Sequence, residues 1–154
     1  MSQFPEIVQR FIKEIKDVPT DGNCGFRVVS DLLGFGVDDW AGLRRKLAME
    51  LSANVENYTE FLFRENGRVY ELLCTLTFYE DRPAPFDKWM TMPDMGHGIA
   101  SCFEVVLVFL SRRQCLTFLP LRSPTKPTIE RRMICIGYVN DCHFVEVQLC
   151  SSIR

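Results

Sequence analysis

The sequence predicts an α+β domain, because helical patterns fill its first half and strand patterns its last third. In the first half, apolar residues recur at spacings of three and four; after residue 104, short β-branched and aromatic runs follow one another through tight turns. Helices first and hairpin-connected strands last predict helices packed on a small, mostly antiparallel sheet built from the C-terminal half. We expect one domain over residues 1–154.

The first three helices have both an apolar face and boundary residues. Pro5 fits the first position of a helix that ends before Pro19, with apolar residues at positions 7, 8, 11, 12 and 15. The second helix begins at Cys24, directly after a turn, and runs to position 33, before Gly34. In the third helix, Asp39 caps a core-facing stripe at positions 40, 43, 47 and 51.

Weaker patterns complete the secondary structure. In chain order, we expect helices around 58–64 and from the 66–67 turn to 76, an ordered loop over 77–88, a short helix through 99–103, strands over 105–110 and 115–119, a proline-rich loop over 120–128, and strands over 133–139 and 143–149. Arg44, Arg45 and Lys46 of the third helix are expected to face solvent.

Composition excludes several classes of protein. Hydrophobic residues make up 47% and charged residues 25%, which is typical of a globular chain and not of a disordered one. The 18 Lys+Arg against 20 Asp+Glu argue against a nucleic-acid partner. The longest wholly apolar run, residues 105–110, is far shorter than the ~20 residues that span a bilayer, so no membrane partner is expected. Nothing indicates oligomerisation, and we expect a monomer.

The seven cysteines are an odd number in a chain large enough to fold without disulfides. We therefore expect reduced thiols and an intracellular compartment. No pair has the CxxC spacing of a zinc knuckle, so neither a metal nor a cofactor is expected. Five cysteines lie in apolar segments and are expected to be small buried hydrophobes: Cys74, Cys102, Cys115, Cys135 and Cys150.

Asp21-Gly22-Asn23-Cys24 is a candidate nucleophile site. A thiol at the first position of a helix lies among unpaired N–H groups at the positive end of the helix dipole, and this lowers its pKa. Those N–H groups, with the Gly22-Asn23 turn, could form an oxyanion hole. Gly22 and Gly25 would leave room for a substrate backbone.

A cysteine nucleophile also needs a base, and the chain has two histidines. His143 opens the last predicted strand, which would hold its ring on a rigid element. His97 lies between Gly96 and Gly98 in a flexible setting. We therefore expect His143 to be the base.

Three ordered blocks resemble the ovarian tumour (OTU) family of cysteine peptidases, which are mostly deubiquitinases. Residues 21–27 (DGNCGFR) resemble its nucleophile box, 89–94 (WMTMPD) its central tryptophan motif, and 137–145 (GYVNDCHFV) its terminal histidine strand. The resemblance covers residues 19–149 and is greatest to OTU-like domains found alongside plant and fungal transposon proteins. It implies a papain-like fold.

The resemblance also implies roles for single residues. Cys24 corresponds to the nucleophile that attacks the carbonyl of a ubiquitin C-terminal glycine, and His143 to the general base. Asp21 corresponds to the residue that shapes the oxyanion hole. Trp89 corresponds to a cleft residue, and Asp94 is either a substrate contact or a helix cap.

The third member of the triad stays open. Many relatives have Asp or Asn two residues after the histidine, where this chain has Val145. Some viral relatives use a polar residue two positions before it, and Asp141 stands there, so we expect Asp141 to orient His143. Asn140 and Glu146 are the alternatives, although Glu146 should point to the opposite face of its strand.

The expected function is that of a deubiquitinase that hydrolyses the bond after the C-terminal glycine of ubiquitin, of a ubiquitin-like modifier or within polyubiquitin chains. One alternative is a catalytically impaired ubiquitin-binding module of the same fold, which the apolar Val145 suggests. The other is a peptidase that processes a polyprotein.

Overall fold

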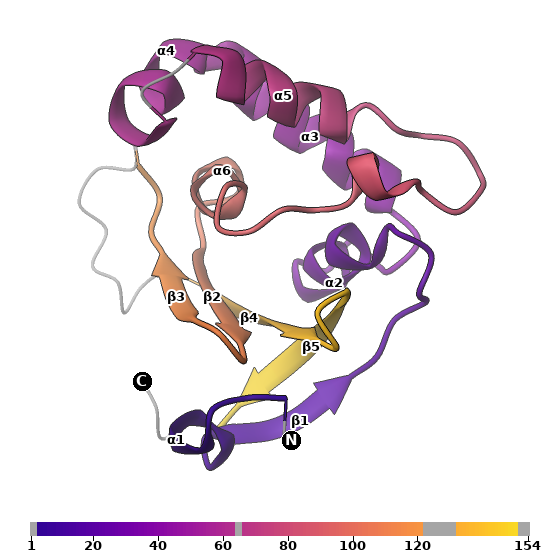
Figure 1. The fold of residues 1–154 in the computed structure, drawn as a ribbon, viewed down its shortest axis with the longest axis vertical. Coiled ribbons are helices and arrows are strands. Elements are labelled where there is room, and N and C mark those ends of the chain that lie inside the picture. The colour runs from indigo at the N-terminus through magenta and orange to yellow at the C-terminus, as the bar shows by residue number, and fades with distance from the viewer. Residues whose placement is uncertain (1–2, 64–65, 122–131, 151–154) are drawn as a thin grey trace.

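A computed structural model describes residues 3–63, 66–121 and 132–150 (Figure 1). Its helical elements are α1 (Glu6–Gln9), α2 (Cys24–Leu32), α3 (Trp40–Ala53), α4 (Val55–Tyr58), the π-helical turn η1 (Thr59–Phe63), α5 (Asn66–Leu76), the 3-10 turn η2 (Phe86–Lys88) and α6 (Gly96–Phe103). Its strands are β1 (Ile12–Lys16), β2 (Val106–Ser111), β3 (Cys115–Phe118), β4 (Met133–Val139) and β5 (His143–Leu149).

The strands form one sheet in the order β1-β5-β4-β2-β3. All neighbouring pairs are antiparallel except β2 and β4, which run parallel. The α+β class and the mostly antiparallel sheet are therefore confirmed. The sheet does not come from the C-terminal half alone, because β1 joins it as an edge strand beside β5.

The helix expected up to Pro19 is wrong after Gln9, where the chain turns into β1. The apolar positions Ile12 and Ile15 are three apart, a spacing typical of a helix. In the structure the register of β1 against β5 shifts between Ile12 and Glu14, as at a β-bulge. A bulge adds one residue to a strand, so that positions three apart can face the same side.

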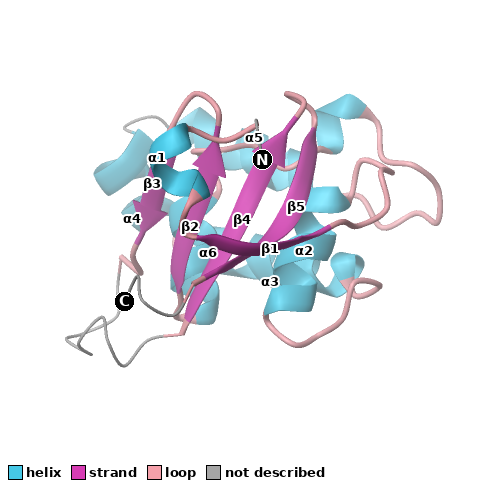
Figure 2. Ribbon diagram, turned by 90° about the horizontal axis from the view of Figure 1, so that it is seen from below, coloured by secondary structure: helices cyan, strands magenta, loops and turns pink. Residues whose placement is uncertain are grey.

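Hydrophobic side chains cover both faces of the sheet. Figures 1 and 2 show α2 to α6 gathered on one face and α1 on the opposite face. The larger core lies under α2 to α6 and includes Phe26, Leu47 and Ile136. A smaller core lies under α1, where the Phe4 ring covers Gly137 of β4.

The other predicted elements appear near their expected positions, with differences of packing. In α5 the buried residues are Val69, Leu72 and Leu76, whereas Tyr70 is exposed. The expected loop over 120–128 lies largely outside the described residues. All seven cysteines are described, and no disulfide joins any two of them. Among the described residues, no helix is long and apolar enough to cross a membrane, and no three potential metal ligands cluster.

Replacing Phe4 by alanine tests whether the smaller core contributes to stability. Phe4 is 3% exposed, and loss of its ring would leave a cavity over Gly137. We expect Phe4→Ala to lower the free energy of unfolding by about 3 kcal/mol, measured by urea denaturation. Ile7→Ala is the control, because Ile7 is 72% exposed. Equal, small effects of both substitutions would contradict a stabilising role for this core.

Candidate active site

The residues Asp21-Gly22-Asn23-Cys24 form a tight turn that leads into α2. Gly22 has a φ of +80°, a left-handed value that favours glycine. A Cβ at Gly22 would lie 2.3 Å from the Ala84 carbonyl oxygen and 2.6 Å from Trp89 Nε1. The same carbonyl accepts a hydrogen bond from Trp89 Nε1 at 3.0 Å. Ala84 and Trp89 therefore fill the space beside Gly22, which is not open to a substrate backbone.

Cys24 is the first residue of α2, as expected, and is 6% exposed. The Phe144 N–H donates to Cys24 Sγ at 3.4 Å, so the thiol lies against the strand that begins at His143. The expected lowering of the thiol pKa is wrong for this structure. Burial, the largest effect, raises the pKa of Cys24, while the N–H groups of Phe144 and Gly25 act in the opposite direction. The neutral thiol is therefore favoured, and a base is needed to ionise it.

His143 begins β5 and is 7% exposed. Its Nε2 lies 2.6 Å from Asp17 Oδ1. Its Nδ1 is buried and has no hydrogen-bond partner among the residues that the structure describes. The hydrogen bond from His143 is the largest cause of a lowered pKa at Asp17. A carboxylate on one ring nitrogen, with the other nitrogen unpaired, is the arrangement of an oriented general base.

Asp141, which was expected to orient His143, lies elsewhere. It sits in the turn between β4 and β5 with a φ of +55°, and its side chain is 70% exposed. Its carboxylate lies 3.8 Å from Arg113 Nη2. Among the described residues, the carboxylate that contacts the His143 ring is that of Asp17.

The two alternatives to Asp141 also lie apart from the histidine ring. Asn140 has a φ of +56° in the same turn, and its N–H donates to Gln3 Oε1 at 3.0 Å. Glu146 points to the opposite face of β5, as expected from strand alternation, and faces Lys16.

Asp17 reaches the histidine because β1 pairs with β5. The register pairs Ile15 with Val147 and Lys16 with Glu146, so the next residue, Asp17, follows on the His143 face. The carboxylate of the residue that directly follows the neighbouring strand thus lies beside His143, where Val145 has no polar group to offer. The prediction of a helix through this segment concealed the pairing, and no local motif marks Asp17.

The side chain of Asp21 stabilises the Asp21–Cys24 turn. Its Oδ1 accepts the Asn23 N–H at 3.0 Å, and its carboxylate forms an ion pair with Arg27 Nη2 at 2.6 Å. Burial acts to raise the pKa of Asp21, but the hydrogen bonds from Arg27 and Asn23 together lower it. Because the Asn23 N–H is engaged, the N–H groups of Gly22 and Cys24 are the better candidates for an oxyanion hole.

A cleft of about 370 Å³ lies next to these elements. Its lining combines aromatic and apolar side chains, among them Phe86, Trp89 and Phe144, with the polar turn 111–114. Trp89 is among the residues that line this cleft, whereas Cys24 and His143 are not. Gly25 gives no room to a substrate, because a Cβ there would meet Met90 at 2.8 Å and Phe144 at 3.1 Å. Gly25 instead allows α2 to pack closely on its neighbours.

Asp94 and His97 have structural surroundings. Asp94 forms an ion pair with Arg68 of α5, is not among the residues that line the cleft, and precedes the N-cap of α6, which is Met95. His97 Nδ1 lies 3.2 Å from the Leu119 carbonyl oxygen, and its ring meets Phe118 edge-on.

Comparison with solved structures identifies the fold. The viral OTU domain protease of Dera Ghazi Khan virus aligns with a TM-score of 0.63 and 14% identity, covering 94% of this chain and 85% of that one. The Hazara virus OTU bound to ubiquitin aligns with a TM-score of 0.65 and 13% identity over the same shares. The OTUD1 OTU domain gives 0.60 and 15%, covering 87% and 84%. The chain has the OTU fold. No family model and no curated protein sequence matches it.

In this OTU fold a buried arginine contacts the Asp21–Cys24 turn. Arg44 of α3 is 0% exposed. Its Nη2 donates to Asn23 Oδ1 at 2.7 Å and to the Lys88 carbonyl at 2.9 Å, and its Nη1 donates to the Thr75 carbonyl at 3.0 Å. The guanidinium carbon lies 4.0 Å from the centre of the Phe26 ring. Arg44 thus joins the turn before Cys24 to the residue before Trp89.

The expectation that Arg44 faces solvent is wrong. Burial lowers its pKa to about 10, so the side chain still carries its charge at neutral pH. The spacing contains a signal for this burial, because Arg44 is four residues after Trp40 and three before Leu47 on the apolar stripe of α3. Arg45, the next residue, is exposed.

Replacing Arg44 by lysine tests whether its three hydrogen bonds stabilise the fold. A lysine keeps the charge but loses the planar fork that reaches three acceptors, and it leaves Asn23 Oδ1 buried without its partner. We expect Arg44→Lys to lower the free energy of unfolding by about 2–3 kcal/mol in urea denaturation. Arg45→Lys is the matched control and should change it by less than about 0.5 kcal/mol. An Arg44→Lys variant as stable as the control would contradict a stabilising role for these hydrogen bonds.

Proposed function

We propose that the protein is a cysteine isopeptidase of the deubiquitinase type, with Cys24 as nucleophile, His143 as general base and Asp17 as the residue that orients the histidine. One observation carries the proposal. His143 Nε2 is held by Asp17 at 2.6 Å, while its buried Nδ1 has no partner among the described residues. Cys24 lies against the same strand end through the Phe144 N–H.

In the first half of the reaction, His143 Nδ1 takes the proton of the Cys24 thiol, and the sulfur attacks the carbonyl carbon of the scissile bond. The resulting oxyanion accepts hydrogen bonds from backbone N–H groups of the Gly22–Cys24 turn. Collapse of this intermediate breaks the C–N bond. The histidinium gives its proton to the departing amine, which leaves a thioester on Cys24.

In the second half, His143 takes a proton from water, and the hydroxide formed attacks the thioester carbonyl. The carboxylic acid leaves, and the thiol of Cys24 regains its proton from the histidinium. The Asp17 carboxylate stabilises the histidinium in both halves, since it accepts the Nε2–H bond throughout. The raised pKa of the buried Cys24 makes this proton transfer necessary rather than optional.

The substrate we propose is the C-terminal glycine of ubiquitin or of a ubiquitin-like modifier, joined to a lysine amine. Support comes from the likeness to the Hazara virus OTU, a protein whose solved structure is bound to ubiquitin. The 370 Å³ cleft with Trp89 in its lining offers an adjoining place for an extended peptide tail.

A second candidate is a ubiquitin-binding module without turnover. The burial of Cys24 favours it, because a 6% exposed thiol with a raised pKa is a weak nucleophile unless His143 ionises it. The apolar Val145 no longer argues for it, since Asp17 supplies a carboxylate to the histidine.

Matched substitutions at Asp17 and Asp141 test the proposed triad. With a fluorogenic ubiquitin C-terminal amide as substrate, Asp17→Asn should lower kcat/KM by about 10²-fold, because the imidazole loses its negative partner. Asp141→Asn should leave kcat/KM within about twofold, since its carboxylate faces Arg113.

Cys24→Ala is the inactive control and should still fold, as judged by circular dichroism. Binding of ubiquitin by the wild type without turnover on the fluorogenic substrate or any di-ubiquitin linkage would favour the binding module instead. A loss at Asp141→Asn that exceeds the loss at Asp17→Asn would assign the orienting role to Asp141 and overturn the triad.

A further inference from the structure

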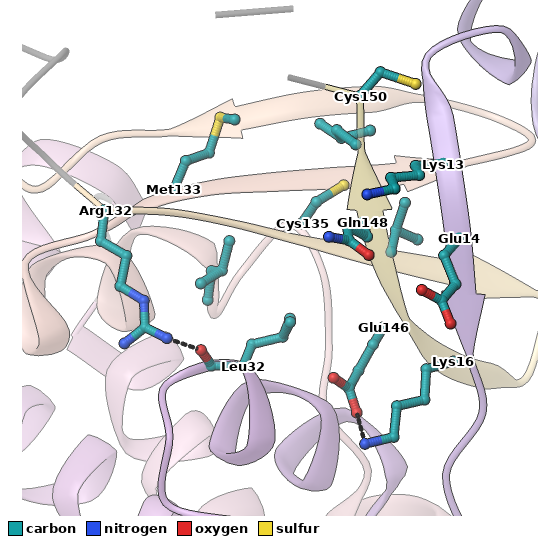
Figure 3. A pocket seen from close by; sticks show the side chains of 13 residues that line it. Lys13, Glu14, Lys16, Leu32, Arg132, Met133, Cys135, Glu146, Gln148 and Cys150 are labelled. Atoms are coloured by element: carbon teal, nitrogen blue, oxygen red, sulfur yellow. Dashed lines mark hydrogen bonds and ion pairs between the residues drawn. The ribbon is translucent and has the colours of Figure 1, made fainter. Parts of the chain in front are cut away.

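The turn between β4 and β5 determines where β5 begins, and its first residue is His143. The pairing of β1 with β5 covers only residues 146–149 of β5. It ends at Lys16 and Glu146, whose side chains face each other at the edge of a hollow of about 820 Å³ (Figure 3). In the part of the chain that the structure describes, residues 143–145 pair with β4 alone. The backbone of His143 therefore depends on its pairing with Val139 and on the turn between these two residues.

This turn has a backbone that few residue types adopt. Asn140 and Asp141 have φ values of +56° and +55°, both in the left-handed region. The Cys142 N–H donates to the Val139 carbonyl at 3.2 Å and closes the turn. A left-handed backbone costs free energy at residues other than glycine, and it persists where surrounding contacts stabilise it. The contacts that the turn makes therefore decide how firmly His143 is positioned.

The hydroxyl of Tyr138 makes one of these contacts. It donates to the Asp141 carbonyl oxygen at 2.7 Å, and so bonds the residue two positions before the candidate base. Burial, the largest effect, raises the pKa of Tyr138, so the hydroxyl keeps its proton at neutral pH and can donate it. A second contact comes from the N-terminal segment, where Gln3 Oε1 accepts the Asn140 N–H at 3.0 Å.

The ring of Tyr138 packs on the residue that follows the candidate base. The centres of the Tyr138 and Phe144 rings lie 4.8 Å apart. The Phe144 N–H in turn donates to Cys24 Sγ at 3.4 Å. Tyr138 thus contacts the chain both before and after His143. Among the described residues, no hydrogen bond joins Tyr138 to the imidazole or to the thiol, so any influence on them passes through the hairpin.

We propose that Tyr138 is a positioning residue for the candidate catalytic pair: its hydroxyl stabilises the turn before His143, its ring packs on Phe144, and the two contacts together keep the imidazole in place to ionise Cys24. The proposal deepens the proposed function and rests on its assignment of Cys24 and His143. Its consequence concerns proton transfer. A displaced imidazole no longer lies within hydrogen-bond reach of the thiol, so less of the thiol is ionised.

Replacing Tyr138 by phenylalanine removes the hydroxyl and keeps the ring. The titratable and charged groups that act on Tyr138 are Cys24, Cys142, Asp141 and Arg113. Because the tyrosine is neutral, the substitution changes no charge among them. An effect of Tyr138→Phe on the reactivity of Cys24 therefore reports on position and not on a lost charge.

The test compares the pH dependence of Cys24 alkylation in wild type and Tyr138→Phe. We measure the rate with iodoacetamide and follow the Cys24 peptide by mass spectrometry, because other cysteines are exposed. Without a positioned base, the buried thiol keeps its raised pKa. The inflection of the rate in Tyr138→Phe should therefore move to higher pH by about one unit, and the rate at neutral pH should fall about fivefold or more.

Tyr70→Phe is the matched control, because Tyr70 lies on α5 and is 57% exposed. It removes a hydroxyl outside the hairpin and should change the rate at neutral pH by less than about 1.5-fold. A merely structural role of Tyr138 would give a different pattern: a lower melting temperature, or faster alkylation of Cys24 at every pH, without a moved inflection. Either of these results would overturn the positioning role.

Turnover gives a second readout. With a fluorogenic ubiquitin C-terminal amide, Tyr138→Phe should lower kcat about fivefold and leave KM within about twofold, because the hydroxyl acts on the base and not on the substrate. Tyr138 also lines the 370 Å³ cleft. A rise in KM with an unchanged kcat would make it a substrate contact and would contradict the proposal.

The outcomes separate this proposal from the proposed function. An unmoved inflection in folded Tyr138→Phe overturns the positioning role, whatever the protein does with ubiquitin. An inflection that moves as stated, together with no turnover of any ubiquitin substrate by the wild type, supports the positioning role and removes the deubiquitinase assignment.

Discussion

The antiparallel pairing of β1 with β5 is the interaction on which the candidate site depends. On one face of this strand pair, Asp17 meets the ring of His143 at 2.6 Å. On the other face, Lys16 lies opposite Glu146. Both contacts follow from a single register, because neighbouring residues of a strand point to opposite faces. If the register of β1 against β5 shifted by one residue, Asp17 would turn to the face of Glu146 and Lys16 to the face of His143. The histidine would then lose its carboxylate partner.

Two polar contacts, of which the first is buried, join α2 to its neighbours over this strand pair. At its first turn, Arg44 binds Asn23, the residue before Cys24. Near its last turn, Asp31 forms an ion pair with Lys16 of β1 at 3.0 Å. Buried polar and charged groups are costly unless their partners are correctly placed, so the Arg44–Asn23 contact tolerates few alternative positions of the first turn of the helix. Cys24 therefore lies at the end of a helix that is fixed by polar contacts as well as by its hydrophobic face.

The sequence could predict those parts of the molecule whose signals are local. The apolar runs of β2, β4 and β5 and the stripe of α3 mark their own elements. The Asp21–Cys24 turn and the strand-opening His143 indicate their chemistry from residue type and setting. The three blocks together also point to the OTU fold, which the structural comparison confirms.

The remaining features depend on contacts between segments far apart in the chain. The bulge in β1 gives a strand the apolar spacing of a helix, and Asp17 acquires its partner only through the pairing with β5. Arginine is seldom buried, so its residue type alone predicts that Arg44 lies on the surface, although it is 0% exposed. The local sequence around Gly25 does not reveal whether the glycine makes room for a substrate or for Met90 and Phe144, because the two side chains come from distant segments.

The central claim is that Asp17 orients His143, and a nitrogen–proton correlation spectrum of the histidine rings tests it most directly. The wild type should show a protected, downfield proton on Nε2 of His143, assigned with a His97→Gln variant. Asp17→Asn should move this signal upfield or remove it by exchange with water, whereas Asp141→Asn should leave it in place. A signal that survives Asp17→Asn and disappears in Asp141→Asn would contradict the account.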